Sequence, residues 1–294
     1  MSTRRLAAAA FLALLAPALA SAAVTKRVPI VTQVQGAVFY RTFLMIANAS
    51  DSPTAVTTLT LTYRSPADGT LQVAPLNIAT IPAGQAETFD DIIQTFKDSA
   101  AIRTQDLGVN IFGSLQVTAS GLSAPTGLVL IARTYSPANE GGTNGIAYVG
   151  RASAGSATEL VTFVANGDFG ESGVTRANIG IVNESGTAPT DLQIAYRDAS
   201  NGVLMKQFRL SDLIHRSLGP GEVDQLNNIF ADPLIPPTTQ LLRVEIRPVS
   251  SSRVTISGYA VQLDSVTNDG SFFLMTEIGG IAPAGLPEAG ETAE

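Results

Sequence analysis

Two short stretches of this chain share one strand pattern, and they decide the fold. Leu59–Arg64 has the sequence Leu-Thr-Leu-Thr-Tyr-Arg, and Leu192–Arg197 has the sequence Leu-Gln-Ile-Ala-Tyr-Arg. Apolar side chains recur at every second position, which is the pattern of a β-strand with one buried face. Asp68-Gly69 and Asn201-Gly202 follow at the same offset of 133 residues, and such dipeptides supply the positive φ angles of tight hairpins. The sequence therefore predicts the same strand and the same turn twice.

Other blocks of the sequence repeat in the same order, with offsets that drift as loop insertions would make them drift. Chance agreement explains any one of these pairs well enough, but agreement of all of them in order favours a duplication. The further pairs are Arg41–Ser50 with Arg176–Ser185 (offset 135), the set Gly84, Asp91 and Ile92 with Gly221, Asn228 and Ile229 (offset 137), and Asn144-Gly145 with Asp269-Gly270 (offset 125).

The rest of the pattern is also that of β-strands, with little helical signal. Helical turns are expected at Asp90–Phe96 and at Leu210–Arg216, the second with Ser211 as its cap and Asp212 in its first turn. We therefore predict an all-β chain with two tandem antiparallel β-sandwich domains after a signal peptide. Further strands are expected at Val109–Thr118, Gly127–Tyr135, Leu241–Ile246 and Val254–Leu263.

The domain boundaries follow from the two copies of the repeat and from the composition of the segments around them. The first sandwich is expected at residues 28–150 and the second at residues 158–281. Small and polar residues at 151–157 predict a linker between the two. The tail at 282–294, rich in proline and glycine, is expected to be disordered.

The N-terminus has the three parts of a secretory signal peptide, at residues 1–22. Arg4 and Arg5 form the positive start, Leu6–Leu15 is a short apolar run, and Ala20–Ala22 offers a small-residue cleavage site. The run is shorter than the ~20 residues of a membrane span, and no integral membrane span is expected after cleavage. Cleavage would leave 16 basic and 25 acidic residues, a net charge of -9. The expected location is secreted, periplasmic or at the cell surface.

The composition excludes several classes of functional site. The chain has no cysteine, no tryptophan and a single histidine, His215, so thiolate sites, disulfides and multi-histidine metal centres are ruled out. A net charge of -7 with only three lysines argues against a nucleic-acid surface, which needs a basic stripe. A sugar-binding platform of exposed aromatic residues is also weakened, because Tyr63 and Tyr196 fall in the buried phase of their strands.

Catalytic candidates are few. A serine, histidine and aspartate triad would have to use His215, with Ser211, Asp212 and Ser217 nearby in sequence. Sequence neighbours on a short helical turn rarely hold the geometry of a triad, so a surface or capping histidine is the preferred interpretation. Paired carboxylates are the other candidates, and solvated acids at strand ends explain them better. These pairs are Asp90 with Asp91, Asp168 with Glu171, and Glu222 with Asp224.

The segment Asp264–Gly270 clusters oxygen ligands over seven residues, as calcium loops do. Val266 stands where a ligand is required, and no glutamate follows at the twelfth place. A polar hairpin turn is therefore the preferred interpretation, and calcium binding stays open. The sequence predicts no catalytic, cofactor-binding or metal-binding residue, and it implies no cofactor.

Two glycosylation sequons, Asn48-Ala49-Ser50 and Asn183-Glu184-Ser185, occupy equivalent places in the two repeats. This equivalence favours a structural role, in which each asparagine ends a strand and the serine bonds to nearby backbone. An arginine-rich, lysine-poor chain with a signal peptide also indicates a bacterial source, where such glycans are uncommon.

Together these motifs resemble the immunoglobulin-like or fibronectin-type-III-like repeats of secreted bacterial surface proteins. The shared features are Asn-x-Ser after a strand, Leu-x-Leu-x-Tyr-Arg, Asp-Gly or Asn-Gly, and a turn before Asp-Asp-Ile or Asn-Asn-Ile-Phe. The resemblance implies two Ig-like sandwiches and transfers no binding residue. The chain lacks the Cys, Trp, Cys core signature, and it has about ten extra residues between Ile92 and Leu115 compared with Ile229 and Leu242.

The export signal, the repeat and the missing catalytic constellation favour a non-enzymatic structural, adhesive or interaction protein. Its expected partner is a protein or a surface polymer, bound through loops or exposed edge strands. One alternative is a periplasmic chaperone-like protein that pairs an edge strand with strands of a client. The other is a hydrolase with a site in the cleft between the two domains.

Overall fold

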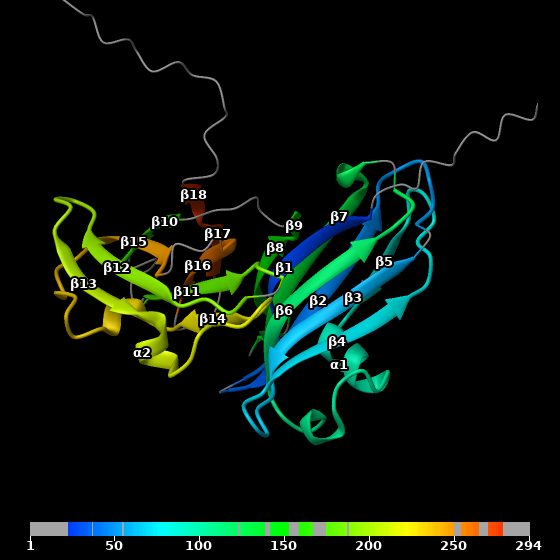
Figure 1. Cartoon of the computed structure of the whole chain (residues 1–294), viewed down its shortest axis with the longest axis horizontal. Helices are drawn as coiled ribbons and strands as arrows, with labels where there is room; N and C mark the ends of the chain where they lie inside the picture. Colours follow the sequence, from blue (N-terminus) through cyan, green and yellow to red (C-terminus); the bar gives the residue numbers. More distant parts are fainter. Residues whose placement is uncertain are drawn as a thin grey trace, which may run out of the picture.

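A computed structural model describes residues 23–36, 38–54, 56–122, 124–138, 142–152, 159–166, 175–186, 188–249, 254–264 and 270–278 (Figure 1). The predicted signal peptide at 1–22, the tail at 282–294 and residues 153–157 of the predicted linker lie outside the described residues. Antiparallel β-sheets dominate the described part, so the predicted all-β fold class is confirmed.

The strands form two series, which we call the N-terminal and the C-terminal sandwich. The N-terminal sandwich contains β1 (Val24–Gln35), β2 (Phe39–Asn48), β3 (Thr57–Arg64), β4 (Leu71–Ile78), β5 (Ala86–Phe89), α1 (Ile92–Asp98), η1 (Thr104–Asp106), β6 (Ile111–Ala119), η2 (Pro125–Gly127), β7 (Leu128–Pro137), β8 (Thr143–Val149) and β9 (Arg151–Ala152). The C-terminal sandwich contains β10 (Glu159–Ala165), β11 (Thr175–Asn183), β12 (Leu192–Asp198), β13 (Leu204–Arg209), α2 (Leu210–Ile214), β14 (Val223–Leu226), η3 (Ile229–Ala231), β15 (Leu241–Pro248), β16 (Ile256–Asp264), β17 (Gly270–Leu274) and β18 (Thr276–Ile278).

Both sandwiches have the same strand order in each of their two layers. The N-terminal layers are β4-β3-β6-β1 and β5-β2-β7-β8, and the C-terminal layers are β13-β12-β15-β10 and β14-β11-β16-β17. A short last strand adds to the first layer each time, since β9 pairs with β1 and β18 pairs with β10. Among the described strand pairings, one has no counterpart, and it joins β1 to β2 at the corner of the N-terminal sandwich. The sequence repeat thus corresponds to a repeated topology.

The two stretches with alternating apolar residues lie in equivalent strands, Leu59–Arg64 in β3 and Leu192–Arg197 in β12. Leu59, Leu61 and Tyr63 are buried in one apolar core, and their counterparts Leu192, Ile194 and Tyr196 are buried in the other. Both tyrosines are therefore core residues, as predicted. The turns that follow are also as predicted, because Gly69 and Gly202 adopt φ values of 71° and 75° between the paired strands.

The two sequon asparagines tie the end of the second strand to the loops beside it. Asn48 is 1% exposed and its amide donates to the carbonyls of Ser52 and Ile81 at 2.7 and 3.0 Å. Asn183 is fully buried and donates to the carbonyls of Ala188 and Leu218, both at 2.9 Å. Each asparagine ends its strand as predicted, and the Ser50 hydroxyl donates to the Ser52 carbonyl at 2.9 Å. The Ser185 hydroxyl is buried without a hydrogen-bond partner within the described residues, so the predicted serine bond is confirmed in the first sequon and wrong in the second.

Two further local predictions are wrong. Asn144-Gly145 lies inside β8, opposite Tyr135 and Ser136, and the hairpin closes earlier, where Ala138 N donates to Gly142 O at 3.2 Å. A Cβ on Gly145 would come within 2.4 Å of a carbonyl oxygen on β7, so close strand approach, not a turn, requires this glycine. Ser211 also does not cap α2.

The N-cap of α2 lies two residues before Ser211. The N-cap is Arg209, whose backbone amide is 3.4 Å from the Asp212 carboxylate. Ser211 lies inside the helix, and its hydroxyl donates to Asp191 at 2.9 Å. The other predicted helical segment is confirmed as α1, with Asp91 as its N-cap. Among the described residues, no helix is both long and apolar enough to cross a membrane.

We expect Asn183→Ala to lower the free energy of unfolding by about 3 kcal/mol, because the change removes a buried side chain that donates to the Ala188 and Leu218 carbonyls and accepts from the Ser185 amide. Denaturant unfolding followed by circular dichroism measures this loss. Asn77→Ala is the matched control, since the exposed Asn77 side chain only accepts from the Thr58 hydroxyl. Equal stability of the two variants would contradict the structural role.

Candidate functional site

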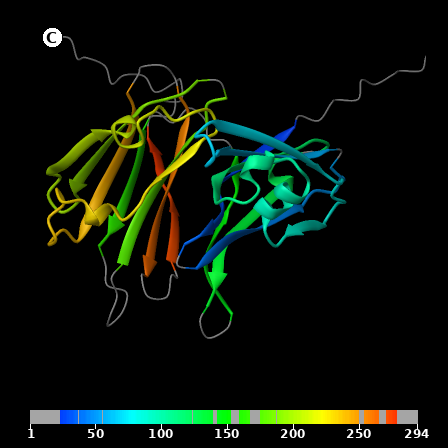
Figure 2. The same cartoon turned by 90° about the horizontal axis from the view of Figure 1, so that it is seen from below.

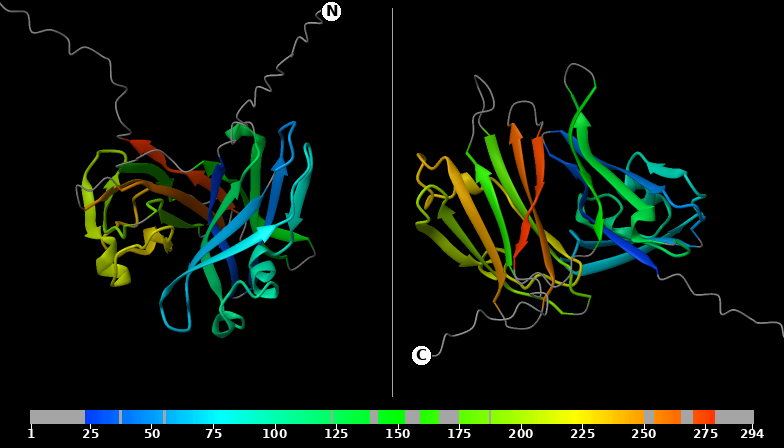
Figure 3. Two further views of the ribbon diagram at one scale, coloured as in Figure 1. Left: turned by 45° about the vertical axis from the view of Figure 1, so that its right-hand side comes forward. Right: turned by 90° about the horizontal axis from the view of Figure 1, so that it is seen from above.

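The outer face of the first N-terminal layer packs against the C-terminal sandwich, and this junction gathers most of the buried charge. β16 and β17 lie alongside β1 and β8 (Figures 2 and 3). Arg27 on β1 forms an ion pair with Glu184 at 2.7 Å, and the two side chains are only 7% and 2% exposed. The same guanidinium donates to Ser114 and Gln116 on β6, and Ser257 donates to the other Glu184 oxygen at 2.7 Å.

A second buried carboxylate, Glu222, is held by donors from both sandwiches. Arg64 of β3 donates to both carboxylate oxygens at 2.7 Å. Arg216 and the backbone amide of Gly219 add one contact each, also at 2.7 Å. The hydrogen bond to Glu222 raises the pKa of Arg64 above its usual value. All four lone-pair positions of the carboxylate are thus occupied.

The structure brings the predicted pair of Glu222 and Asp224 together, but around a cation. Arg216 lies 2.7 Å from Glu222 and 3.0 Å from Asp224. A carboxylate whose acceptor positions are all occupied has no free position for a reacting atom. This pair therefore stabilises the junction through charge.

Aromatic rings complete the junction on the side of β8 and β17. Phe272 stacks between Tyr148 of the N-terminal sandwich and Tyr259 of the C-terminal one, at centroid distances of 4.8 and 5.1 Å. The Tyr148 hydroxyl donates to the Ile30 carbonyl at 2.6 Å. Burial raises the pKa of Tyr148 and of Tyr259 well above the ordinary value. The ring stack therefore joins the sandwiches away from the ion pairs.

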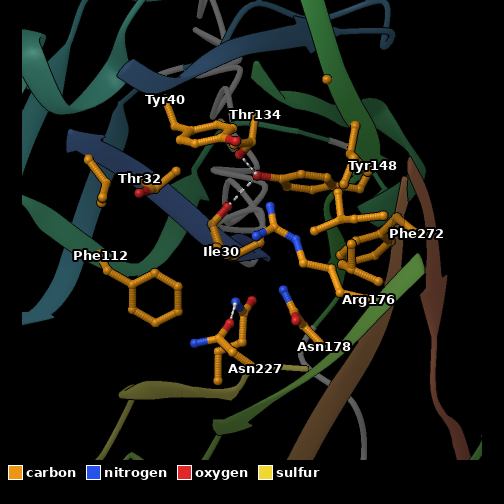
Figure 4. Close-up of a pocket in the computed structure, with 16 residues that line it drawn as sticks. Ile30, Thr32, Tyr40, Phe112, Thr134, Tyr148, Arg176, Asn178, Asn227 and Phe272 are labelled. Atoms are coloured by element: carbon orange, nitrogen blue, oxygen red, sulfur yellow. Dashed lines mark hydrogen bonds between the residues drawn. The ribbon is translucent and has the colours of Figure 1, made fainter. Parts of the chain in front are cut away.

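Between the ion pairs and the ring stack lies a cavity of about 300 Å³. Figure 4 shows Arg176 reaching into it from β11, with Phe112 on one side and Tyr148 and Phe272 on the other. Asn178 and Asn227 lie at the same end as the arginine stem. The remaining lining residues are Ile30, Thr32, Val34, Tyr40, Thr134, Gly145, Ile146, Gln225, Val261 and Leu263.

The structure does not assemble the triad candidates. His215 is exposed at the end of α2 in a left-handed conformation with φ of 56°. Ser211 donates to Asp191, and Asp212 accepts from the Arg209 backbone. Ser217 is exposed one turn further on. His215 is thus the surface, helix-ending residue that the sequence analysis preferred.

Asp90 and Asp91 do not line the cavity. Asp91 accepts from the backbone of Gln94 and from the side chain of Gln33, while Asp90 is exposed. Asp168 and Glu171 lie outside the described residues, as do residues 265–269 of the calcium candidate Asp264–Gly270. No group of three or more metal-binding side chains occurs within the described ranges.

The sequence analysis missed the residues that join the sandwiches. Glu184 and Glu222 stand where the first repeat has Ala49 and Gln85, at the offsets of 135 and 137. An acidic residue in one repeat that aligns with a neutral residue in the other indicates a contact that only the first of these repeats makes. The arginine partners carried no such signal, because their proximity arises only in the tertiary structure.

No protein-family model matches the sequence, and no curated protein matches it.

We expect Glu184→Gln to destabilise the chain by about 3–5 kcal/mol, because Arg27 then stays buried without a counter-charge. Glu87→Gln is the control, since Glu87 is exposed on the edge strand β5. Chemical denaturation of both variants gives the comparison. If Glu184→Gln unfolded at the same denaturant concentration as Glu87→Gln, the ion pair would not hold the junction.

We expect stability to fall as the pH rises from about 10 to 12. Burial, followed by the hydrogen bond to Asp106, raises the pKa of Tyr63 to about 12, and burial also raises the pKa of Tyr148, Tyr196 and Tyr259. Tyrosines of the unfolded chain ionise near pH ~10, so that state releases protons first. Stability is therefore fully present below about pH 10 and is lost above it.

The measurement is the denaturation midpoint across this range, with tyrosinate absorbance recorded in parallel. Tyr63→Phe should reduce the loss of stability with rising pH, because one buried hydroxyl is removed. Tyrosinate absorbance that rises in the folded chain near pH ~10 for all six tyrosines would contradict the assignment.

Proposed function

We propose that this chain is an exported, non-enzymatic interaction protein built of two Ig-like sandwiches. The observation that carries the proposal is an open face on the C-terminal sandwich. This face is equivalent to the one that the N-terminal sandwich uses to hold its neighbour, and we call it the arginine face. It consists of the outward side chains of β12, β15 and β10, chiefly Arg197, Arg243, Glu245, Arg247 and Phe163.

The equivalence of the two faces follows from the strand registers. Tyr63 pairs with Gly113, and Tyr196 pairs with Val244. Ser114, which follows Gly113 in β6, therefore corresponds to Glu245, which follows Val244 in β15. The other outward-facing residues of these two strands correspond at the same offset. In the N-terminal sandwich this face is covered by the loop that carries Glu222. The arginine face has no such cover within the described residues.

The arginine face has an excess of positive charge in an otherwise acidic protein. Arg197, Arg243 and Arg247 surround the single buried carboxylate of Glu245 at 3.2, 2.9 and 3.5 Å. Beside them Phe163 leaves 57% of its surface exposed. A second carboxylate, Glu159 of β10, lies 3.9 Å from Arg247. Three guanidinium groups against two carboxylates still favour a partner that brings carboxylates. The proposed partner is thus an acidic protein surface or an acidic surface polymer.

Binding to poly-glutamate and to polygalacturonate, with dextran as the uncharged comparison, tests this proposal. We expect both acidic polymers to retain the protein at low salt and to release it at about 0.5 M salt. Replacing Arg243 and Arg247 by Gln should abolish retention. The matched control replaces Arg41 and Arg133 by Gln, which makes the same charge change beside Tyr135 in the N-terminal sandwich. Equal retention of the two double variants, or none by the parent chain, would contradict the proposal.

Two outcomes would favour the alternatives. Turnover of ester, peptide or glycoside substrates that His215→Ala abolishes would make the chain a hydrolase. Assembly subunits that bind along an edge such as β13 and survive the two arginine substitutions would favour a chaperone-like protein.

A further inference from the structure

The junction joins two unlike faces of the repeated sandwich. The N-terminal sandwich contributes the outer face of its first layer, through Arg27 and Arg64. The C-terminal sandwich contributes the outer face of its second layer, β14-β11-β16-β17, where Val182, Tyr259 and Val261 are buried against residues of the N-terminal sandwich. The N-terminal sandwich has an equivalent second-layer face on β5, β2, β7 and β8. We call it the β2 face.

The strand registers show that the two second-layer faces are equivalent. Phe43 of β2 pairs with Arg133, and its counterpart Asn178 of β11 pairs with Val261. Met45 corresponds in the same way to Gly180 at the offset of 135 residues. At these two central positions the β2 face therefore has larger apolar side chains than the face that the junction buries.

The β2 face is apolar although it points away from the core. Along β2 and β7 the buried core residues alternate with outward residues, as they do in any strand that packs on one side only. Antiparallel sheets with one face in water usually carry polar side chains there, and a contiguous apolar face indicates a contact surface. Its outward apolar side chains are the half-buried Phe43, Met45, Val129 and Ile131, together with Val149, which is 56% exposed.

Within the described residues, no strand or helix covers the β2 face. The helix beside β2, α1, packs into the core of its own sandwich. Near the start of β2, Arg41 and Arg133 lie against the Tyr135 ring, at 4.9 and 5.6 Å from its centroid. The β2 face thus has an apolar centre and two arginines at one end.

The β2 face is large enough for a specific contact between folded surfaces. Strands spaced about 4.8 Å apart, with a rise of about 3.3 Å per residue, give a four-strand layer a plane of roughly 400 Å². Pleating and side chains raise the accessible area above that value, so two such faces stacked together bury on the order of 1,000 Å². Specific interfaces between proteins begin at about this size.

The counterpart in the C-terminal sandwich shows what kind of surface fits the β2 face. There the second layer receives the outer face of another sandwich of this chain. A second copy of the chain offers two such open faces, the arginine face and its own β2 face. The arginine face does not suit, because Ala49 and Gln85 stand at the positions of the two junction carboxylates. Arg41 and Arg133 also bring charge of the same sign.

We propose that the β2 face is a dimer interface, which stacks on the β2 face of a second copy about a two-fold axis. An axis that runs across the strands places the arginine-bearing end of one copy over the opposite end of the other, where Ala49 and Gln85 lie, so the like charges stay apart. Phe43, Met45 and Ile131 lie at the centre, and their burial drives association. Isologous contacts of this kind are the commonest in homo-oligomers.

This contact is separate from the acidic partner proposed above. The arginine face belongs to the other sandwich, and it stays open when two β2 faces stack. A dimer of this kind presents two arginine faces to one acidic surface.

Sedimentation velocity of the full chain tests the dimer. We expect the mass of two chains at about 0.1 mM protein. Ile131→Glu brings a carboxylate from each copy into the apolar centre, and it should raise the dimer dissociation constant at least about 100-fold. Val149→Glu should act in the same direction. Val73→Glu is the matched control on the edge strand β4, where this valine is 60% exposed, and it should leave the dimer unchanged.

Cross-linking gives a second measurement that does not depend on a charge in the apolar centre. The chain has no cysteine, so a single introduced cysteine can be cross-linked only between two chains. With a short bis-maleimide, Ile131→Cys should form a covalent dimer and Val73→Cys should not. Replacing Arg243 and Arg247 by Gln should leave the dimer intact, which separates this contact from the binding of acidic polymers.

Several results would overturn the dimer. These are a parent chain that stays monomeric at about 0.1 mM, a folded Ile131→Glu variant that still dimerises as the parent does, and equal cross-linking of the two cysteine variants. Loss of the dimer on replacing Arg243 and Arg247 would place the contact on the arginine face and would equally overturn the assignment. Denaturant unfolding shows that each variant is folded before it is compared.

Discussion

Two carboxylates buried between the sandwiches, Glu184 and Glu222, constrain how the two halves of this chain meet. A buried carboxylate that loses its partners costs several kcal/mol, so the halves must stay where those partners can reach. Glu184 takes donors from Arg27 in one sandwich and Ser257 in the other. Glu222 likewise takes Arg64 from one and Arg216 from the other. Apolar contacts alone would let the two sandwiches slide against each other. Hydrogen-bond donors from both sandwiches fix their relative position and orientation.

The duplicated sandwiches keep their cores and differ on the equivalent outer faces. Where the N-terminal sandwich has Ser114, small enough for the Gly221 carbonyl to approach at 2.5 Å, the C-terminal one has Glu245 with its arginines. By the same registers Glu159 corresponds to Arg27, a reversal of charge. The second face therefore cannot receive a copy of the loop that covers the first. The first face thus supports the neighbouring sandwich, and the second face has no such cover within the described residues.

The sequence predicts the parts of this fold that depend on neighbours along the chain. The period of two places Tyr63 and Tyr196 in the cores, and the positive φ of Gly69 and Gly202 places the hairpins. Asn144-Gly145 carries the same turn signal and fails, because its glycine serves a contact across two strands. Local sequence does not distinguish these two uses of glycine.

The residues of the candidate site could not be predicted from local sequence either, because the site depends on contacts between distant strands. Arg176 and Asn178 belong to a predicted repeat block, yet nothing in that block indicates that they face a cavity. Its walls come from strands of both sandwiches, so it exists only once the halves have met. Even the acidic residues that align with neutral ones in the first repeat indicate a contact without naming the arginines opposite.

The cavity persists because the junction is fixed at its two ends by different forces. Ion pairs at Glu184 and Glu222 hold one end, and the Phe272 ring stack holds the other. The walls of the cavity are held apart at both ends, so the space between them cannot close. A small residue adds to the space, since Thr32 lines the cavity where the equivalent C-terminal position has Phe163. The position of Thr32 thus keeps open a space that the larger side chain of its C-terminal counterpart would fill.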